Sequence, residues 1–288
     1  MPVNSQKNLY LRIAPEIYLK KLIVGGMERV YEIGKQFRNE GKDKTHNHEF
    51  TSCEFYMSYA SYDHLFELTE KMVREMVFAV NHSYSVQTEI DNQQHTIHFD
   101  LPFRRIDVVS ELENRLGCQL SIFDSHSHFF KDPFQFYRNK YSFSSEQQED
   151  SFPLSNKERE EEEKIEKERE EKIISQLESI CNKNDIRLSP QSTTINKIVD
   201  TMIGELIEPL CIQPTFLINH PLQMSPLAKK NRNNTYLSER FELFIAGKEF
   251  VNAYSELNNP FEQRVRFHFQ QKDALRGDNE GSFFLSFV

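Results

Sequence analysis

Polar side chains stand inside segments that otherwise alternate like β-strands, and these residues have the chemistry for a binding site. Arg38 and Glu40 are spaced two apart, as are Glu54 and Tyr56, so each pair shares one face of an extended chain. Charged groups on a sheet face cost free energy unless they form ion pairs or bind a ligand. A second set of such residues lies later in the chain: Glu242, Glu249, Asn252, Tyr254 and Glu256.

These residues allow two interpretations. Taken one at a time, they favour a solvent-facing side of a sheet that carries ordinary salt bridges. Taken together, they favour a polar cleft built on a sheet. The excess of carboxylates in such a cleft would suit a cationic ligand or a divalent metal ion.

Several other kinds of site are excluded by missing motifs. The sequence has no G-x-x-x-x-G-K-[ST] phosphate loop, no G-x-G-x-x-G, no G-x-S-x-G and no H-E-x-x-H. The pairs His46/His48, His95/His98 and His126/His128 lack a cysteine or carboxylate at metal-ligand spacing. We therefore expect these histidines to be surface or loop residues.

The first polar set lies in a block predicted as a helix, a hairpin and a second helix. Pro15 begins a run with helical spacing that Gly25-Gly26 ends. Two alternating strands follow, Arg29–Arg38 and Phe50–Ala60, joined by a polar loop. An amphipathic helix is then predicted over Tyr62–Asn81.

The second polar set lies in a predicted hairpin near the end of the chain. A helix over about Ile195–Glu208 and a strand over Thr215–Ile218 come before it. The hairpin strands are Ser238–Ile245 and Phe250–Leu257, and a charged helix follows over Pro260–Gly277. Antiparallel hairpins with helices between them predict an α+β fold, with an antiparallel sheet and flanking helices.

A charged segment interrupts this pattern. In KEREEEEKIEKEREEK, from Lys157 to Lys172, only Ile165 is uncharged, so the segment has no apolar face with which to pack. Opposite charges four residues apart could hold it as a solvated helix. We expect residues 124–172 to be a helical or disordered insertion between two parts of one domain, 1–123 and 173–288. A docking helix for a partner is the alternative.

Composition limits the class of protein. The 288 residues carry a formal net charge of −9, which excludes a uniformly basic nucleic-acid-binding surface. No apolar run approaches the roughly 18 residues of a membrane-spanning helix, and the N-terminal residues do not resemble a signal peptide. Four scattered cysteines are typical of reduced core residues. We expect a cytoplasmic protein without a membrane partner.

Three segments resemble one family, the lysyl-tRNA synthetases within the class II aminoacyl-tRNA synthetases. Arg12–Tyr62 resembles motif 2 and its approach, with FRNE ending at Glu40 and CEFY ending at Tyr56. His220–Lys229 and Glu239–Arg264 resemble the same enzymes, and NAYSEL in the latter is typical of the lysine-specific members. The resemblance covers nearly the whole chain apart from the charged segment, and it implies the class II catalytic core.

The resemblance also implies an activity and a set of ATP-binding residues. Lysine and ATP would form lysyl-adenylate and pyrophosphate, and the lysyl group would then pass to tRNA(Lys). Arg38 would be the catalytic residue, bridging the lysine carboxylate and the α-phosphate. Glu40 would accept from the adenine amino group, and Phe50 would stack on adenine. The other implied contacts to ATP are His46 and Asn47, with Glu242 and Glu249 holding Mg²⁺.

Amino-acid selection would use carboxylates, according to the same resemblance. Glu16 would bind the α-ammonium group of lysine. A carboxylate that faces the ε-ammonium group rejects an uncharged analogue, because the carboxylate would be left unpaired. The implied lysine-binding residues are Glu16, Arg38, Glu54, Tyr56, Asn252, Tyr254 and Glu256.

Three departures from the family pattern shape the expected activity. The anticodon-binding domain and motif 1, which builds the family's homodimer, would precede Met1. Motif 3 would follow Phe284, and His48 stands where the family usually has proline. We therefore expect an incomplete catalytic core that aminoacylates poorly alone.

Other functions remain open at this point. A non-catalytic synthetase-like protein could bind lysine, an adenylate or a regulatory partner, and an incomplete reading frame could have no function of its own. An aspartyl- or asparaginyl-tRNA synthetase is the runner-up among enzymes. Such an enzyme would need basic residues where Tyr254 and Glu256 stand.

Overall fold

The chain divides into two units, residues 1–61 (unit 1) and residues 62–288 (unit 2). The computed structural model describes residues 10–39, 41, 46–99, 102–120, 123, 156–190 and 194–275. Glu40, residues 124–155 and the last residues of the chain therefore lie outside the described part. Among the described helices, none has the length and hydropathy needed to span a membrane.

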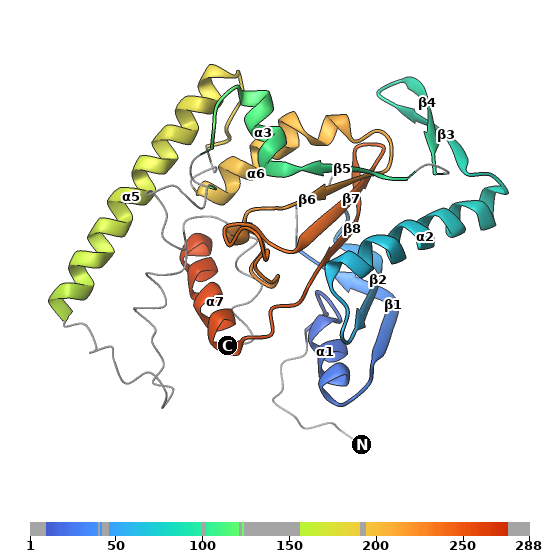
Figure 1. Ribbon diagram of the computed structural model, residues 1–288, viewed down its shortest axis with the longest axis horizontal. Coiled ribbons are helices and arrows are strands. Elements are labelled where there is room, and N and C mark those ends of the chain that lie inside the picture. Colours follow the sequence, from blue (N-terminus) through green and yellow to red (C-terminus); the bar gives the residue numbers. More distant parts are fainter. Residues whose placement is uncertain are drawn as a thin grey trace. The chain divides into compact units, whose positions relative to one another are not determined.

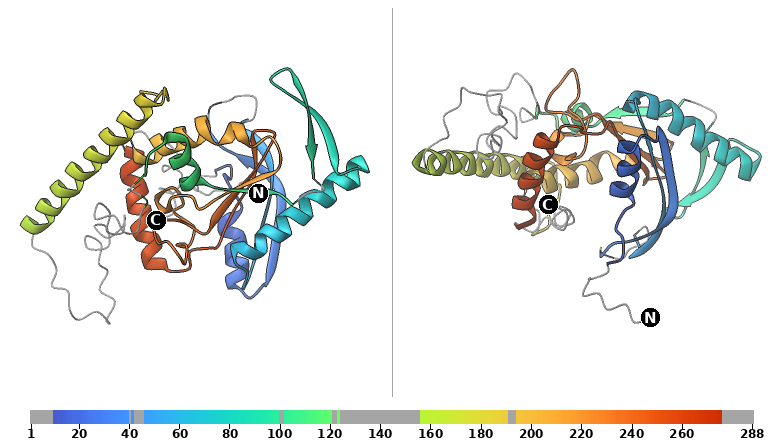
Figure 2. Two further views of the ribbon diagram at one scale, coloured as in Figure 1. Left: turned by 45° about the horizontal axis from the view of Figure 1, so that its top comes forward. Right: turned by 90° about the horizontal axis from the view of Figure 1, so that it is seen from below.

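Unit 1 is a two-stranded hairpin with a helix on one face. Helix α1 (Glu16–Val24) precedes strands β1 (Arg29–Phe37) and β2 (Glu49–Met57), which pair antiparallel. Helix α1 lies along the hairpin in Figure 2. Gly26 ends the helix with a φ of +100°, a conformation that glycine adopts without strain, as the Gly25-Gly26 pair predicts.

Unit 2 begins with helix α2 (Tyr62–Asn81) and a hairpin of β3 (Ser85–Ile90) and β4 (Gln93–His98). Asp91 and Asn92 form the tight turn, with φ of +48° and +62°. Positive φ at both central residues matches the twist of a two-residue hairpin, and Asp and Asn tolerate it well. This hairpin was not predicted, although the Asp-Asn pair between alternating segments is a recognisable turn signal.

A four-stranded sheet forms the centre of unit 2, in the order β5-β6-β7-β8. Its strands are β5 (Arg104–Asp107), β6 (Thr215–Ile218), β7 (Arg240–Ile245) and β8 (Lys248–Tyr254). The pairs β6–β7 and β7–β8 are antiparallel, whereas β5–β6 is parallel. The predicted α+β fold is confirmed, and the parallel pair is an addition to the predicted antiparallel sheet.

The predicted strand Phe250–Leu257 is wrong at both ends. Strand β8 starts at Lys248 and ends at Tyr254. Beyond that point the chain changes partner, because Glu256 pairs with Ala228 and the Leu257 amide donates to the Leu227 carbonyl at 2.8 Å. The backbone stays extended, so the alternation in the sequence is the same on both sides of the change.

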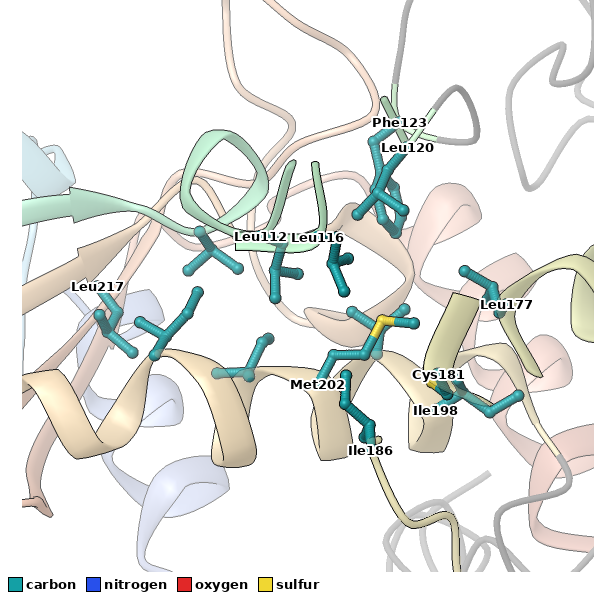
Figure 3. Close-up of a cluster of buried hydrophobic side chains, with 14 of the residues drawn as sticks. Leu112, Leu116, Leu120, Phe123, Leu177, Cys181, Ile186, Ile198, Met202 and Leu217 are labelled. Carbon is teal, nitrogen blue, oxygen red and sulfur yellow. The ribbon is translucent and has the colours of Figure 1, made fainter. Parts of the chain in front are cut away.

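Helices cover both faces of the sheet (Figure 1). One face packs against α2, where Phe66 stacks on Phe241 with ring centroids 4.3 Å apart and meets Phe216 edge-on at 5.0 Å. On the other face, strand side chains join a buried cluster with three helices, α3 (Val108–Leu116), α5 (Asn156–Lys183) and α6 (Ile195–Leu206). Figure 3 shows their buried side chains meeting, with Leu112 and Leu116 facing Met202.

Side-chain caps fix the starts of two of these helices. Asp107 accepts a hydrogen bond from the Ser110 amide at 2.9 Å, and Thr194 accepts one from the Lys197 amide at 3.2 Å. Two short 3₁₀ turns, η2 (Glu208–Leu210) and η3 (Leu222–Met224), precede strands β7 and β8 in the sequence. Helix α7 (Pro260–Leu275) follows β8.

Helix α5 contains the charged segment and continues beyond it. Ion pairs one turn apart line its exposed part, such as Lys164–Glu168 at 4.0 Å and Lys167–Glu171 at 3.9 Å. The predicted solvated helix is confirmed for this part. From Ile173 onward the same helix is buried at every fourth residue, through Leu177 and Cys181. The division into 1–123, 124–172 and 173–288 stays a proposal.

The four cysteines are free. Cys181 and Cys211 are buried, as predicted for core residues, and burial raises the pKa of each thiol to about 11. Cys53 is exposed on β2 and Cys118 is half-buried, so the prediction of four core cysteines is wrong for these two.

Candidate active site

In unit 1, the candidate site residues lie on one face of the β1–β2 hairpin. In the register, Glu32 stands opposite Glu54, and Val30 stands opposite Tyr56, so these side chains share a face. The alternate residues of β1 point the other way, and Tyr31 is 73% exposed. The alternation predicted for Glu54 and Tyr56 is therefore confirmed in the structure.

Contacts to the backbone and to an aromatic ring hold Arg38 just past the end of β1. Its amide donates to the His48 carbonyl at 2.9 Å, which extends the strand pairing by one step. Its Nε donates to the Ile13 carbonyl at 3.2 Å, and its guanidinium carbon lies 5.2 Å from the ring centroid of Phe50. A planar cation beside an aromatic ring can hold an anion and stack a flat ligand at neighbouring positions.

Glu54 is the centre of a small cluster of charges. Tyr56 donates a hydrogen bond from its hydroxyl to Glu54 Oε1 at 2.6 Å. Burial raises the pKa of the Glu54 carboxyl above its usual value, and the negative charge of Glu16 adds to this rise. The hydrogen bond from Tyr56 and the positive charges of Lys20 and Arg38 oppose it. The structure thus brings Glu16, Arg38, Glu54 and Tyr56 together, as the expected lysine-binding set requires.

Arg12 and Lys20 were not predicted as members of this cluster. Lys20 Nζ lies 2.5 Å from Glu16 Oε1 and 5.6 Å from the ring centroid of Tyr56. Arg12 forms an ion pair with Glu32 and donates from Nε to the Lys35 carbonyl at 2.9 Å. The Glu16–Lys20 spacing of four residues was a signal in the sequence that could have found the second of these cations.

In unit 2, a β-bulge brings Glu249 onto the polar face of the last hairpin. Glu242 stands opposite Asn252, but the register then shifts, and Phe244 stands opposite Glu249. Regular alternation would put Glu249 and Asn252 on opposite faces, because their numbers differ by three. The extra residue in the bulge cancels that difference.

Glu242 is the most strongly held carboxylate of this face. His220 Nε2 lies 3.1 Å from its Oε2, and Arg240 forms an ion pair with its Oε1. Burial alone would raise the pKa of Glu242, but the charges of Arg240 and His220 lower it well below the usual value. His220 is itself buried, so the His220–Glu242 contact is held away from water.

Arg240 ties the hairpin to the loop before it. Its Nε donates to Asn252 Oδ1 at 3.1 Å, and its Nη1 donates to the Met224 carbonyl at 3.1 Å. Tyr254 stands opposite Arg240 in the register, and Glu256 lies beyond the end of β8. His220 and Arg240 were missed as site residues, although both lie within the segments that carry the family resemblance.

Glu242 and Glu249 suit a divalent cation that also binds phosphate. Desolvation raises the pKa of the Glu249 carboxyl to about 7, and the charge of Glu242 contributes to this rise, although the residue as a whole is exposed. Two carboxylates that repel each other gain from a shared cation. In the described part of the chain, no three acidic, cysteine or histidine residues form a complete metal site. Mg²⁺ is often held by one or two carboxylates plus substrate phosphates, so this pair fits it.

The predicted residues therefore fall into two sets. Unit 1 contains Glu16, Arg38, His46, Asn47, Phe50, Glu54 and Tyr56, and unit 2 contains Glu242, Glu249, Asn252, Tyr254 and Glu256. Glu40 lies outside the described residues.

Comparison with known proteins adds an independent finding. A family model described as tRNA synthetases class II (D, K and N) matches residues 1–288. The chain is 43% identical over 278 residues to a probable cytoplasmic lysine–tRNA ligase of Encephalitozoon cuniculi, covering 95% of this chain and 46% of that protein. It is 40% identical over 278 residues to the corresponding protein of Vairimorpha ceranae, with the same coverage.

A third relative shows a similar degree of identity. The chain is 38% identical over 276 residues to the lysine–tRNA ligase cla4 of Cladosporium cladosporioides, covering 96% of this chain and 39% of that protein. The chain thus spans about half or less of the length of these curated relatives.

Proposed function

The chain belongs to the class II tRNA synthetases (D, K and N), and we propose that it provides the substrate-binding part of a lysine–tRNA ligase. The observation that supports this most is the acidic cluster around Glu54. Two carboxylates, Glu16 and Glu54, lie beside a tyrosine ring and hydroxyl, and a cation already lies among them. Such a cluster suits an ammonium group rather than the carboxylate or amide of aspartate or asparagine.

The proposed reaction is the activation of lysine by ATP and the transfer of the lysyl group to tRNA(Lys). Its first step is an in-line attack of the lysine carboxylate on the α-phosphate, which releases pyrophosphate. The protein would act by positioning and charge neutralisation, with no nucleophile of its own. Arg38 is placed for this, because its guanidinium is anchored at Nε and a planar guanidinium can bridge two anions.

Adenine would stack on Phe50, beside the guanidinium of Arg38. His46 and Asn47 would approach ATP from the loop between the strands, and Glu40 would accept from the adenine amino group. At the end of this loop, the His48 carbonyl accepts a hydrogen bond from the Arg38 amide, which fixes the loop to the end of β1.

Glu242 and Glu249 would hold Mg²⁺ between the phosphates of ATP. The ion would neutralise the negative charge that builds on the leaving pyrophosphate. His220 and Arg240 would keep the Glu242 carboxylate ionised and hold its orientation.

Selection of lysine would come from carboxylates and tyrosines, as the family resemblance implies. Glu16 would take the α-ammonium group, and Glu54, Tyr56, Tyr254 and Glu256 would surround the ε-ammonium group, with Asn252 beside them. An analogue without the ε-charge would leave a partly buried carboxylate unpaired, which costs about 1–3 kcal/mol or more.

The family also suggests where and with what the protein works. Two of the relatives are named cytoplasmic lysine–tRNA ligases, and we place this chain in the cytoplasm on that basis. Its proposed partners are lysine, ATP and tRNA(Lys), with the homodimer of the family as the proposed assembly.

A thermal-shift experiment tests the proposal with three non-hydrolysable adenylate analogues, carrying lysyl, aspartyl or asparaginyl groups. A ligand that binds only the folded protein raises the unfolding midpoint by mass action. We expect a rise with the lysyl analogue alone. A rise with the aspartyl or asparaginyl analogue would instead indicate an aspartyl- or asparaginyl-tRNA synthetase. No rise with any analogue would contradict the proposed binding function.

Catalysis needs a second readout, because a non-catalytic relative would also bind the lysyl analogue. Lysine-dependent exchange of pyrophosphate into ATP reports adenylate formation directly. We expect exchange with lysine, and an Arg38→Lys variant should lose most of it, because an ammonium group cannot hold two anions in the same plane.

A further inference from the structure

We infer that Lys20 is a positioning residue of the amino-acid pocket: an ammonium group supplied by the chain itself that orients Glu16 and balances the negative charge shared by Glu16 and Glu54. The inference deepens the proposed function and rests on it for the identity of the substrate. Its structural part, the effect of Lys20 on the two carboxylates, can be tested without any substrate.

The geometry places Lys20 at the centre of the cluster. Its Nζ lies 2.5 Å from Glu16 Oε1 across one turn of α1. The same atom lies 5.6 Å from the ring centroid of Tyr56 on β2. One ammonium group thus connects the helix to the strand that carries Glu54, and it does so where a substrate ammonium group is proposed to bind.

An ion pair on a fully exposed helix surface leaves both side chains free to move. The side chains of Lys20 and Glu16 are 32% and 20% exposed, so both are largely withdrawn from water. The next residue gives the contrast, because Lys21 is exposed and lies 5.7 Å from the ring of Tyr18 on its own helix.

The charges that face Glu54 explain why a cation is needed there. From α1 it faces Glu16 and Lys20, from the end of β1 it faces Arg38, and on its own strand it accepts from Tyr56. Glu32 stands opposite it on β1 and is paired with Arg12. Without Lys20, Glu16 and Glu54 would keep their mutual repulsion, with Arg38 as the remaining cation that acts on Glu54.

Repulsion of this kind is relieved by a proton. A carboxyl group beside a like charge and away from water binds a proton more readily, and its pKa rises. A proton on Glu54 would compete with the ammonium group of the substrate. Lys20 therefore widens the pH range over which Glu54 is ionised and able to bind a cation.

Three variants of the whole chain test this inference. Lys20→Met removes the charge and keeps the length of the side chain, and Lys20→Arg restores the charge. Lys21→Met removes the same charge one residue later and is the matched control. Glu54 is followed by ¹³C NMR of its carboxyl carbon, with the signal assigned by its loss in a Glu54→Gln variant.

We expect Lys20→Met to raise the midpoint of the Glu54 titration by roughly 0.3 units or more, the size of one weak ion-pair contribution. Lys20→Arg should return the midpoint toward that of the wild type, and Lys21→Met should leave it unchanged. An unchanged midpoint in Lys20→Met, or an equal shift in Lys21→Met, would overturn the inference. The Lys20→Arg variant separates loss of the charge from damage to the fold. If it keeps the wild-type midpoint while Lys20→Met shifts it, the shift comes from the missing charge.

Calorimetry across a range of pH measures the binding of L-lysine to the same proteins and tests the functional part of the inference. The acid limb of binding should move to higher pH in Lys20→Met and stay in place in Lys21→Met. If L-lysine binds none of the proteins while the NMR midpoint still shifts, the proposed substrate is wrong and the role of Lys20 stands. If lysine binds with the same acid limb in both variants, Lys20 has no part in the pocket.

Discussion

Tyr56 donates a 2.6 Å hydrogen bond to Glu54 from two residues along the same strand. The contact holds a carboxylate whose pKa is raised by burial, so it favours the ionised form at a place where a proton would otherwise be held more tightly. Within unit 1, this pair is the most direct link between the fold of the hairpin and the proposed choice of a cationic substrate.

Removing this hydrogen bond should weaken the binding of lysine. In Tyr56→Phe, Glu54 loses a donor and becomes easier to protonate, so we expect affinity for lysine to fall about tenfold, equivalent to about 1.4 kcal/mol. Equilibrium binding at neutral pH measures this. Tyr59→Phe is the control, because Tyr59 is fully exposed. Equal affinities in the two variants would show that the Tyr56 hydroxyl does not act on the pocket.

Helix α5 should contribute to stability only through its buried part. Leu177 is 2% exposed in the core beneath α3 and α6, whereas Ile165 on the same helix is 59% exposed. We expect Leu177→Ala to lower the free energy of unfolding by about 2–4 kcal/mol and Ile165→Ala to change it by less than about 0.5 kcal/mol. Urea denaturation measures both. Similar losses would mean that the charged part of α5 is packed rather than solvated.

Arg266 should be essential to the loop that carries His220 and leads into the last hairpin. It is completely buried, donates to the Ala228 carbonyl at 2.6 Å and forms an ion pair with Glu262 at 3.1 Å. Arg266→Met leaves a buried carboxylate and buried carbonyls with fewer donors, so we expect a loss of about 3 kcal/mol in stability. The exposed Arg264 on the same helix provides the control variant, Arg264→Met. A small and equal effect of both would show that the loop is held by other contacts.

Glu208 predicts a pH dependence of stability. Burial, with the charges of Asp200 and Glu242, raises its pKa from 4.5 to about 7 in the folded protein. The folded state therefore holds a proton that the unfolded state has lost, and stability falls as the pH rises from about 4.5 to about 7. Glu208→Gln should remove this loss, raising the unfolding midpoint near pH 8 and leaving it unchanged near pH 4.5.

The control for this experiment is Glu205→Gln, because Glu205 is exposed on the neighbouring turn. A thermal unfolding series across pH is sufficient. If Glu208→Gln gives no gain near pH 8, the Glu208 carboxyl is hydrated in the folded protein and carries no such penalty.

The parts of the fold predicted from the sequence are those with local signals. Gly25-Gly26 ends α1 because glycine adopts a positive φ without strain. Glu54 and Tyr56 share a face because strand alternation has a period of two. The site residues of each unit follow from such local rules and from the family resemblance.

The parts that were not predicted depend on distant segments. Strand β5 is four residues long and pairs in parallel with β6, which lies more than a hundred residues later, so its short sequence carries no signal of its own. The bulge at Phe244 that turns Glu249 onto the polar face depends on strand pairing. The continuity of α5 was missed because its exposed and buried parts differ so strongly in composition.

The central claim is that the acidic cluster around Glu54 selects lysine, and calorimetry with a non-hydrolysable lysyl-adenylate analogue tests it most directly. Glu54→Gln should weaken binding by about tenfold or more, because it removes a carboxylate proposed to face the ε-ammonium group. Glu49→Gln, at an exposed position of β2, should bind like the wild type. An affinity unchanged in Glu54→Gln would contradict the account.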